Sequence, residues 1–445
     1  ANGAAAGRYG RWFYYEHFNL YIITMRNLKL VATCLFLGFY IVSGAQGGRI
    51  LTFGEFMHGV RERNIGYSAE KYGVDMARAD AEASRVFPDP ELSVDYANNQ
   101  DWSLRMGYSV EASLGYTVEL GGKRRARIDA ARSRMEMTEA AVEDYFRNLR
   151  ADASIAWFTA LKSAKDCAIR RSSYLRMLEV AAADSIRYRS GDISETDARQ
   201  SRLEAGGMLN EAYAAEGAMR DAVVELVWLA GLDAAPDSVA GDILYVRRDF
   251  DLGRLIEIAL DNRADVRAAL KAEEVSRHNL RVAKAARVTD LGVSAGAVYS
   301  SKALNEIAPA PAFTGLMAGV SIPLRLSNRN RGDLNAARAA TLRSSTEREA
   351  AKARTSAEVR QAYNRYVVAC RQVEQYGAGL LDDAASILRS KTYAYRRGES
   401  GLLELLNAER TYNDVHMNYN ETLYNYATAL VELERACGIW DENES

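Results

Sequence analysis

The chain has few prolines, cysteines and histidines, and each shortage excludes a class of protein. Only six prolines occur in 445 residues, and none lies between residues 91 and 235 or after 323. Because proline interrupts helices, these gaps leave room for very long ones. Four cysteines and four histidines are too scattered for a zinc module or a disulfide scaffold. The formal net charge of −2 lacks the basic excess of a nucleic-acid binder. We therefore expect no metal site, no cofactor and no nucleic-acid partner.

Long apolar runs are also scarce, and the longest one lies near the start of the chain. Basic residues follow Met25, an apolar run covers 30–42, and the small residues Ser-Gly-Ala end at position 45. This is the layout of a secretory signal peptide over 25–45. Residues 1–24 are then an upstream extension, and the mature chain begins at Gln46. Beyond residue 46 no apolar run reaches the 18 residues of a candidate membrane-spanning helix.

The signal segment also contains a cysteine. Cys34 follows Val-Ala-Thr, a weak match to a lipoprotein cleavage box in which Thr33 fits poorly. Export would leave Cys167, Cys370 and Cys437, an odd number, so we expect no complete disulfide framework.

The remainder of the chain is a duplicated unit. Residues 128–132 match 334–338, and residues 188–192 match 395–399, at offsets of 206 and 207. The offset is far longer than the period of a solenoid repeat. We therefore divide the chain into a first repeat, a linker, a second repeat and a short tail, which cover 46–232, 233–250, 251–438 and 439–445.

Each repeat carries two segments with the period of a β-strand. From 104 to 118, apolar and polar or small residues alternate almost without fault. This alternation predicts a strand with one apolar and one polar surface. Further strands are predicted at 91–97, 291–299 and 313–324. Transmembrane barrels of bacteria begin at about eight strands, so four strands require oligomerisation to hide their edges.

Long helices follow the strands in both repeats. Residues 122–188 and 329–395 each predict one uninterrupted helix, and each helix turns back at a glycine into a second one. The helical hairpins therefore cover 122–231 and 329–438. The returning helix of the second repeat has a heptad seam, which predicts an antiparallel coiled coil. Its members are Leu405, Tyr412, Tyr419, Tyr426 and Leu433. In the first repeat the same positions are Ala198, Ala205, Ala212, Met219 and Leu226.

No residues in the chain suggest catalysis. The glycine-containing run at 121–125 lacks the Walker pattern of a phosphate-binding loop. No nucleophile is paired with a base, so we expect no enzyme activity. The pattern leaves open an exported coiled-coil structural protein or adhesin, and an enzyme with a helical core is a more distant alternative.

The order of signal peptide and then twice helix, two strands and long helical hairpin resembles the TolC-type outer-membrane efflux proteins. Two junctions sharpen the resemblance. Residues 119–127 (ELGGKRRAR) are similar to the strand-to-helix junction of the heavy-metal (CzcC- and CusC-like) branch. Residues 322–324 (IPL), followed by 328–332 (NRNRG), are similar to the second junction. The sequence departs from the branch at 325–327, where Arg-Leu-Ser replaces an expected Pro-Leu-Phe-like run.

The resemblance implies a mostly α protein with some β structure and a passive function. Three protomers would build a trimeric twelve-stranded β-barrel in the outer membrane, continued by an α-helical coiled-coil barrel in the periplasm. The protein would be the exit duct of a tripartite efflux system, partnered by outer-membrane lipid, a periplasmic adaptor and an inner-membrane RND-type pump. Its cargo would be heavy-metal cations; a multidrug or type I secretion channel of the same fold is the alternative.

The resemblance also assigns sites to the hairpin ends, which could otherwise be simple turns. Residues implied to form the periplasmic tip and contact the adaptor are Arg187, Gly191, Asp192, Tyr395, Gly398 and Glu399. The pore constriction is assigned to Asp197, Glu404 and Asn407. Asp197 and Glu404 each lie six residues after the turn glycine of their repeat. In the family, acidic residues at the position of Glu404 point into the lumen. Three copies would form a ring of negative charge that favours cations. The alternative is a solvated helix face.

Overall fold

The computed structural model describes residues 50–99, 105–324, 330–377 and 379–439. The chain divides into two compact units, and nearly all of the described fold belongs to the unit formed by Leu51–Ala235 and Val239–Ser445. The signal segment at 25–45, with Cys34, lies outside the described residues, as do the extension 1–24 and most of the tail 439–445. No helix in the described part of the chain is both long enough and apolar enough to cross a membrane.

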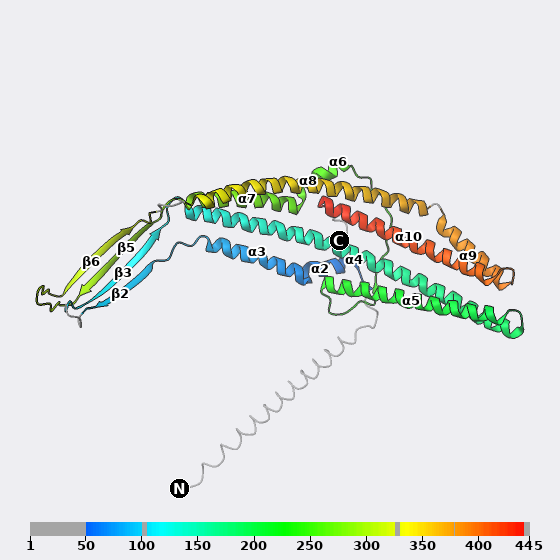
Figure 1. The fold of residues 1–445 in the computed structure, drawn as a ribbon. Coiled ribbons are helices and arrows are strands. Elements are labelled where there is room, and N and C mark those ends of the chain that lie inside the picture. Colours follow the sequence, from blue (N-terminus) through cyan, green and yellow to red (C-terminus); the bar gives the residue numbers. More distant parts are fainter. Residues whose placement is uncertain (1–49, 100–104, 325–329, 378, 440–445) are drawn as a thin grey trace, which may run out of the picture. The chain divides into compact units, whose positions relative to one another are not determined.

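The first repeat consists of four helices and two strands of the main sheet. Two short helices, α2 (Phe53–Arg63) and α3 (Ile65–Ala83), come before the strands. A 68-residue helix, α4 (Lys123–Ser190), and the returning helix α5 (Glu195–Ala230) form a hairpin after them. Thr52 and Glu55 cap the start of α2 reciprocally, which satisfies backbone donors that the helix itself leaves free. Figure 1 shows α4 and α5 side by side over the length of α5.

The second repeat follows the same order, but its hairpin contains a break. Its helices are α6 (Leu252–Asn262), α7 (Ala264–Ala285), α8 (Arg331–Tyr376), α9 (Leu380–Arg396) and α10 (Leu402–Cys437). The prediction of one continuous helix over 329–395 was wrong, because α8 ends at Tyr376 and α9 begins at Leu380. Gly379 has φ of 104°, a conformation that glycine adopts without steric cost. The absence of proline therefore did not guarantee an unbroken helix.

The four long strands form one antiparallel sheet in the order β2-β3-β5-β6. They are β2 (Glu91–Asn98), β3 (Tyr108–Val118), β5 (Leu291–Ser300) and β6 (Phe313–Ser321). The strand predicted over 104–118 begins only at Tyr108, because Arg105 and Gly107 have φ of 42° and 80° and turn the chain. The strand predicted over 313–324 ends at Ser321, just before Pro323, which cannot donate to a ladder. Shorter strands are β1 (Ile50–Leu51) and β4 (Ser238–Val239).

The register collects apolar side chains on one surface of this sheet. Leu92 pairs with Leu114, and Leu114 pairs in turn with Ala295, which faces Ala318. The next row of the same face contains Val94, Ala112, Ala297 and Leu316. This surface is solvent-exposed in the single chain: the exposed fractions are 69% for Leu92, 54% for Leu114 and 90% for Leu316. The opposite face carries small and polar residues such as Ser93, Ser113 and Gly296.

The helices of the two repeats pack against one another around a shared hydrophobic core. α4 packs against α5 from its own repeat and against α7 and α10 from the other. Trp157 of α4 stacks on Phe56 of α2, with ring centroids 5.4 Å apart, and both side chains are almost fully buried. The heptad seam predicted for the returning helix of the second repeat is confirmed at three of its positions. Leu405, Tyr426 and Leu433 of α10 are buried. The repeats are therefore not separately folded domains.

The segment predicted as a linker, 233–250, is fixed to the second repeat by tyrosine side chains. Tyr426 donates its hydroxyl hydrogen to the carbonyl of Val246 (2.6 Å). Tyr366 donates to the carbonyl of Arg248 (2.9 Å) and accepts from the backbone N–H of the same residue. Since each bond restrains backbone directly, this part of the linker is an ordered strap across α8 and α10 rather than a free tether.

Candidate functional site

Three of the predicted tip residues lie where α4 turns into α5. Arg187 is in the last turn of α4, and Gly191 and Asp192 follow the helix. α4 ends at Gly191, whose φ of 85° is left-handed. The backbone N–H of Asp192 donates to the carbonyl of Arg187 (2.9 Å), closing the helix in the manner of a Schellman motif. The hydroxyl of Ser190 also donates to the Asp192 carboxylate (2.7 Å). A residue with a Cβ atom at position 191 would be strained in this turn.

The turn between α9 and α10 has the same geometry. Gly398 has φ of 76°, and the N–H of Glu399 donates to the carbonyl of Ala394 (2.9 Å). The Glu399 carboxylate forms an exposed ion pair with Arg397 (2.8 Å). The local match between 188–192 and 395–399 therefore reflects two copies of one helix-ending motif.

The structure brings the two turns together through a buried polar contact. Tyr395 of α9 donates its hydroxyl hydrogen to Asp184 of α4 (2.7 Å), and Asp184 is fully buried. The guanidinium of Arg187 lies over the Tyr395 ring, 5.6 Å from its centroid, and 3.7 Å from the Asp184 carboxylate. Burial, and then the bond to Asp184, raise the pKa of Tyr395, so its phenol stays protonated and remains a donor. The Asp184–Tyr395 contact therefore ties the first hairpin to the second.

Sequence reasoning missed Asp184. A detectable signal exists: Met177, Val180 and Ala181 precede it at helical spacing and are all buried, so an acid at 184 falls on the core-facing side of α4. A charged residue on such a face requires a partner. Which residue provides the partner depends on how α4 and α9 pack, and spacing within α4 does not contain that information.

The three residues assigned to a pore constriction have different surroundings. The Glu404 carboxylate accepts from Lys391 of α9 (2.5 Å) and from the Ser400 hydroxyl (3.0 Å), and its side chain is 55% exposed. These bonds, that from Lys391 above all, hold the pKa of Glu404 below its ordinary value near 4.5. Asp197 instead belongs to the cap of α5, where it exchanges hydrogen bonds with Ser194. Asn407 is exposed.

Further polar pairs join α4 to α10 below the turns. Arg176 of α4 forms a short, bidentate ion pair with Glu409 of α10, whose side chain is only 6% exposed. One helical turn further, Ser173 donates to the Asn413 side chain (2.6 Å). Breaking one partner of such a buried pair leaves the other uncompensated. The hairpins are thus joined at several levels between Ser173 and Tyr395.

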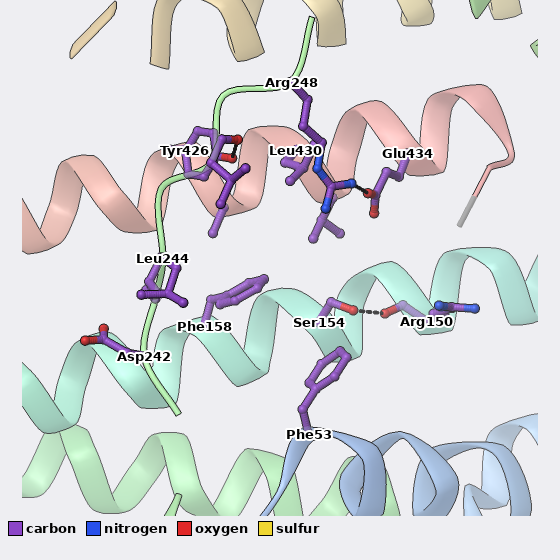
Figure 2. A pocket seen from close by; sticks show the side chains of 14 residues that line it. Phe53, Arg150, Ser154, Phe158, Asp242, Leu244, Arg248, Tyr426, Leu430 and Glu434 are labelled. Atoms are coloured by element: carbon purple, nitrogen blue, oxygen red, sulfur yellow. Dashed lines mark hydrogen bonds and ion pairs between the residues drawn. The ribbon is translucent and has the colours of Figure 1, made fainter. Parts of the chain in front are cut away.

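A cavity of about 260 Å³ lies between α2, α4, α10 and the strap. Figure 2 shows Phe53 and Phe158 on one side of it and Arg248, which reaches Glu434 (3.7 Å), on the other. The hydroxyl of Ser154 donates to the backbone carbonyl of Arg150 (2.9 Å). No cluster of three or more His, Cys, Asp or Glu residues within the described ranges could hold a metal ion.

These features define a class of protein. An antiparallel sheet with an exposed apolar face, joined to long helical hairpins in two repeats, is the architecture of an outer-membrane channel protomer. The model of the outer membrane efflux protein family matches residues 60–232 and 255–439. The chain belongs to this family of outer-membrane efflux channel proteins.

The chain is also similar to individual outer-membrane and metal-resistance proteins, in sequence or in fold. The chain is 26% identical over 376 residues to the cobalt-zinc-cadmium resistance protein CzcC of Cupriavidus metallidurans, covering 84% of this chain and 87% of the relative. A membrane protein from Pseudomonas aeruginosa is 19% identical and has the same fold with a TM-score of 0.72, covering 88% and 94% of the two chains. The CusC structure gives a TM-score of 0.69 at 17% identity, covering 86% and 91%.

Proposed function

We propose that the protein is a homotrimeric exit duct in the outer membrane, with its helical hairpins in the periplasm. The proposal rests on two features of the four-stranded sheet. Its apolar face is exposed, and within the described residues its edge strands β2 and β6 each pair on one side only. Three such sheets closed edge to edge give twelve strands, which hides every edge and presents the apolar faces to lipid.

The helical hairpins would extend the duct toward a partner. The tip residues Asp192 and Glu399 lie on exposed turns, where they are available to a periplasmic adaptor. Arg187 lies beside them and packs on Tyr395, so it would support the tip from within. An inner-membrane RND-type pump would supply the energy, since the proposed duct itself is passive. The role of the tips rests on the family and on the two matching turns.

The cargo proposed is heavy-metal cations. The name of the Cupriavidus metallidurans relative is the basis for this choice, and the acidic Glu404 is compatible with it. Zinc, cobalt and cadmium tolerance should be measured in a strain that carries the adaptor and pump but lacks this chain. Restoration of tolerance by the chain is expected. Restored drug tolerance or peptide secretion without metal tolerance would instead support a multidrug or type I secretion channel.

A further inference from the structure

A group of cations surrounds the four points where the sheet meets the helices. The antiparallel register places the start of β2, the end of β3, the start of β5 and the end of β6 together at one end of the sheet. Six cations lie four to ten residues from these points along the chain, and we name them the junction belt. They are Arg85, Arg124, Arg125, Lys284, Arg287 and Arg331.

The belt is held on an ordered support. Lys123 forms an ion pair with Asp290 (2.6 Å). This pair joins the two repeats at the end of the sheet. Arg127 binds Glu119 (2.8 Å) and donates to the carbonyls of Ser84 and Val86. These two cations are thus used internally and fix the backbone from which the belt extends.

The belt cations form no ion pair with an acid among the residues that the structure describes. Arg85, Arg125 and Arg287 are exposed and form no ion pair within the described ranges. Arg124 donates to the carbonyl of Arg85 (2.7 Å), and its guanidinium lies 4.1 Å from the centroid of the Phe87 ring. The exposed acids nearby, outnumbered by the belt, are Glu82, Asp89, Glu91 and Asp333.

Exposed apolar side chains lie among these cations. Val86 and Phe87 are 58% and 59% exposed, and Val288 and Ile322 are 41% and 56% exposed. An aromatic ring beside long basic side chains, at the end of an apolar sheet face, is typical of a membrane–water interface. Cations just outside the hydrocarbon region attract anionic headgroups.

We infer that the junction belt binds the phosphate headgroups of anionic phospholipids at the periplasmic surface of the membrane. The inference rests on the proposed insertion of the sheet in the outer membrane. Charge complementarity selects this lipid class, because zwitterionic headgroups offer no net charge to unpaired cations. The bound headgroups set the depth at which the sheet lies in the bilayer.

Native mass spectrometry of the full-length protein in detergent tests this, with phosphatidylglycerol and phosphatidylcholine as probes. The wild type should bind phosphatidylglycerol more tightly, and added salt should weaken that binding. At about fivefold per cation, the triple variant R85Q/R125Q/R287Q should lose roughly 100-fold in affinity. The charge-preserving triple R85K/R125K/R287K should keep most of it.

The matched control removes the same charge from α8. Arg354, Arg360 and Arg365 are exposed and have no ion-pair partner within the described ranges, so R354Q/R360Q/R365Q should bind like the wild type. Should the junction triple fail to assemble, K284Q/R331Q replaces it, with an expected loss of roughly 25-fold.

Three outcomes would overturn the inference. They are equal binding by the wild type and the junction triple, equal binding of the two lipids, and full displacement of phosphatidylglycerol by millimolar inorganic phosphate. A conductance measurement distinguishes these three outcomes from a failure of the proposed channel function. A protein that conducts normally in pure phosphatidylcholine bilayers but shows no lipid preference remains a duct without a lipid-binding belt.

Discussion

At the scale of single residues, the contact between Asp184 and Tyr395 is the main link between the hairpin ends. Both groups are buried, and the hydroxyl of Tyr395 is the donor that satisfies one oxygen of Asp184. Buried polar groups are costly to leave without partners, so this bond matters more than its exposed neighbours.

Tyr395→Phe should therefore loosen the hairpin ends. Removing the hydroxyl leaves a buried carboxylate oxygen without its donor, at a cost of about 1–3 kcal/mol. Hydrogen exchange of the amides in the last turns of α4 and α9 should become faster. Tyr393→Phe is the control, because Tyr393 is 60% exposed and its hydroxyl accepts only from Arg397 among the described residues. Equal exchange in both variants would contradict a linking role for Tyr395.

The ion pair between Glu404 and Lys391 changes what is expected of a charge ring. Glu404→Ala leaves Lys391 without its partner, so each protomer gains one net positive charge at this position and cation selectivity should fall. The double variant K391A/E404A should return toward the wild type. Ion selectivity in planar bilayers measures both variants. Wild-type selectivity in all of these variants would remove Glu404 from the constriction.

The same pair predicts how selectivity depends on pH. Because the pKa of Glu404 lies below its ordinary value near 4.5, the carboxylate stays charged as pH falls from about 7 to about 5.5. Its contribution should be lost only when pH falls through the lowered pKa. Lys391→Gln removes the largest cause of the shift, so the loss should begin at higher pH. A selectivity change centred near pH 6 would point to a group other than Glu404.

At the scale of elements, the sheet is defined by a difference between its two faces. Leu114 is 54% exposed on the apolar face, whereas Ser113 lies on the small, polar face next to Gly296. If the apolar face meets lipid, the two neighbouring positions should respond differently to charge.

Leu114→Arg should impair membrane assembly much more than Ser113→Arg. A cation on the lipid side of a barrel costs about 2–4 kcal/mol near the bilayer midplane, whereas one on the aqueous side remains hydrated. Val110→Arg and Ser109→Arg form a second pair with the same expected order. The amount of heat-modifiable oligomer in outer-membrane fractions measures the effect. Similar losses on both faces would argue against a lipid-facing sheet.

At the scale of the whole molecule, the four-stranded sheet has two edge strands, β2 and β6, that each pair on one side only within the described residues. Four strands with two open edges expose backbone donors and acceptors that lipid cannot satisfy. Native mass measurement or cross-linking in detergent should therefore give a trimer. The junction variant R85Q/R125Q/R287Q should remain trimeric, because the belt does not lie on a strand edge. A stable monomer under the same conditions would contradict the duct.

Much of the architecture could be predicted from the sequence because it repeats at short range. Alternation over 104–118 identified β3, although the strand begins only at Tyr108, and a seven-residue period identified the buried seam that includes Leu405 and Tyr426. Gly191 and Gly398 marked the two turns because few other residues adopt their conformation. These features depend on neighbours along the chain, so spacing alone is sufficient.

The tertiary structure alone decided which distant residues meet. Spacing gave no reason to pair Asp184 with Tyr395, 211 residues apart, or Glu404 with Lys391 across a turn. The strap held by Tyr366 and Tyr426 also depends on packing between α8, α10 and the segment before α6. Local pattern determines which faces are apolar and where a helix ends. The partner of each polar group is set by how the helices pack, and packing is a property of the whole fold.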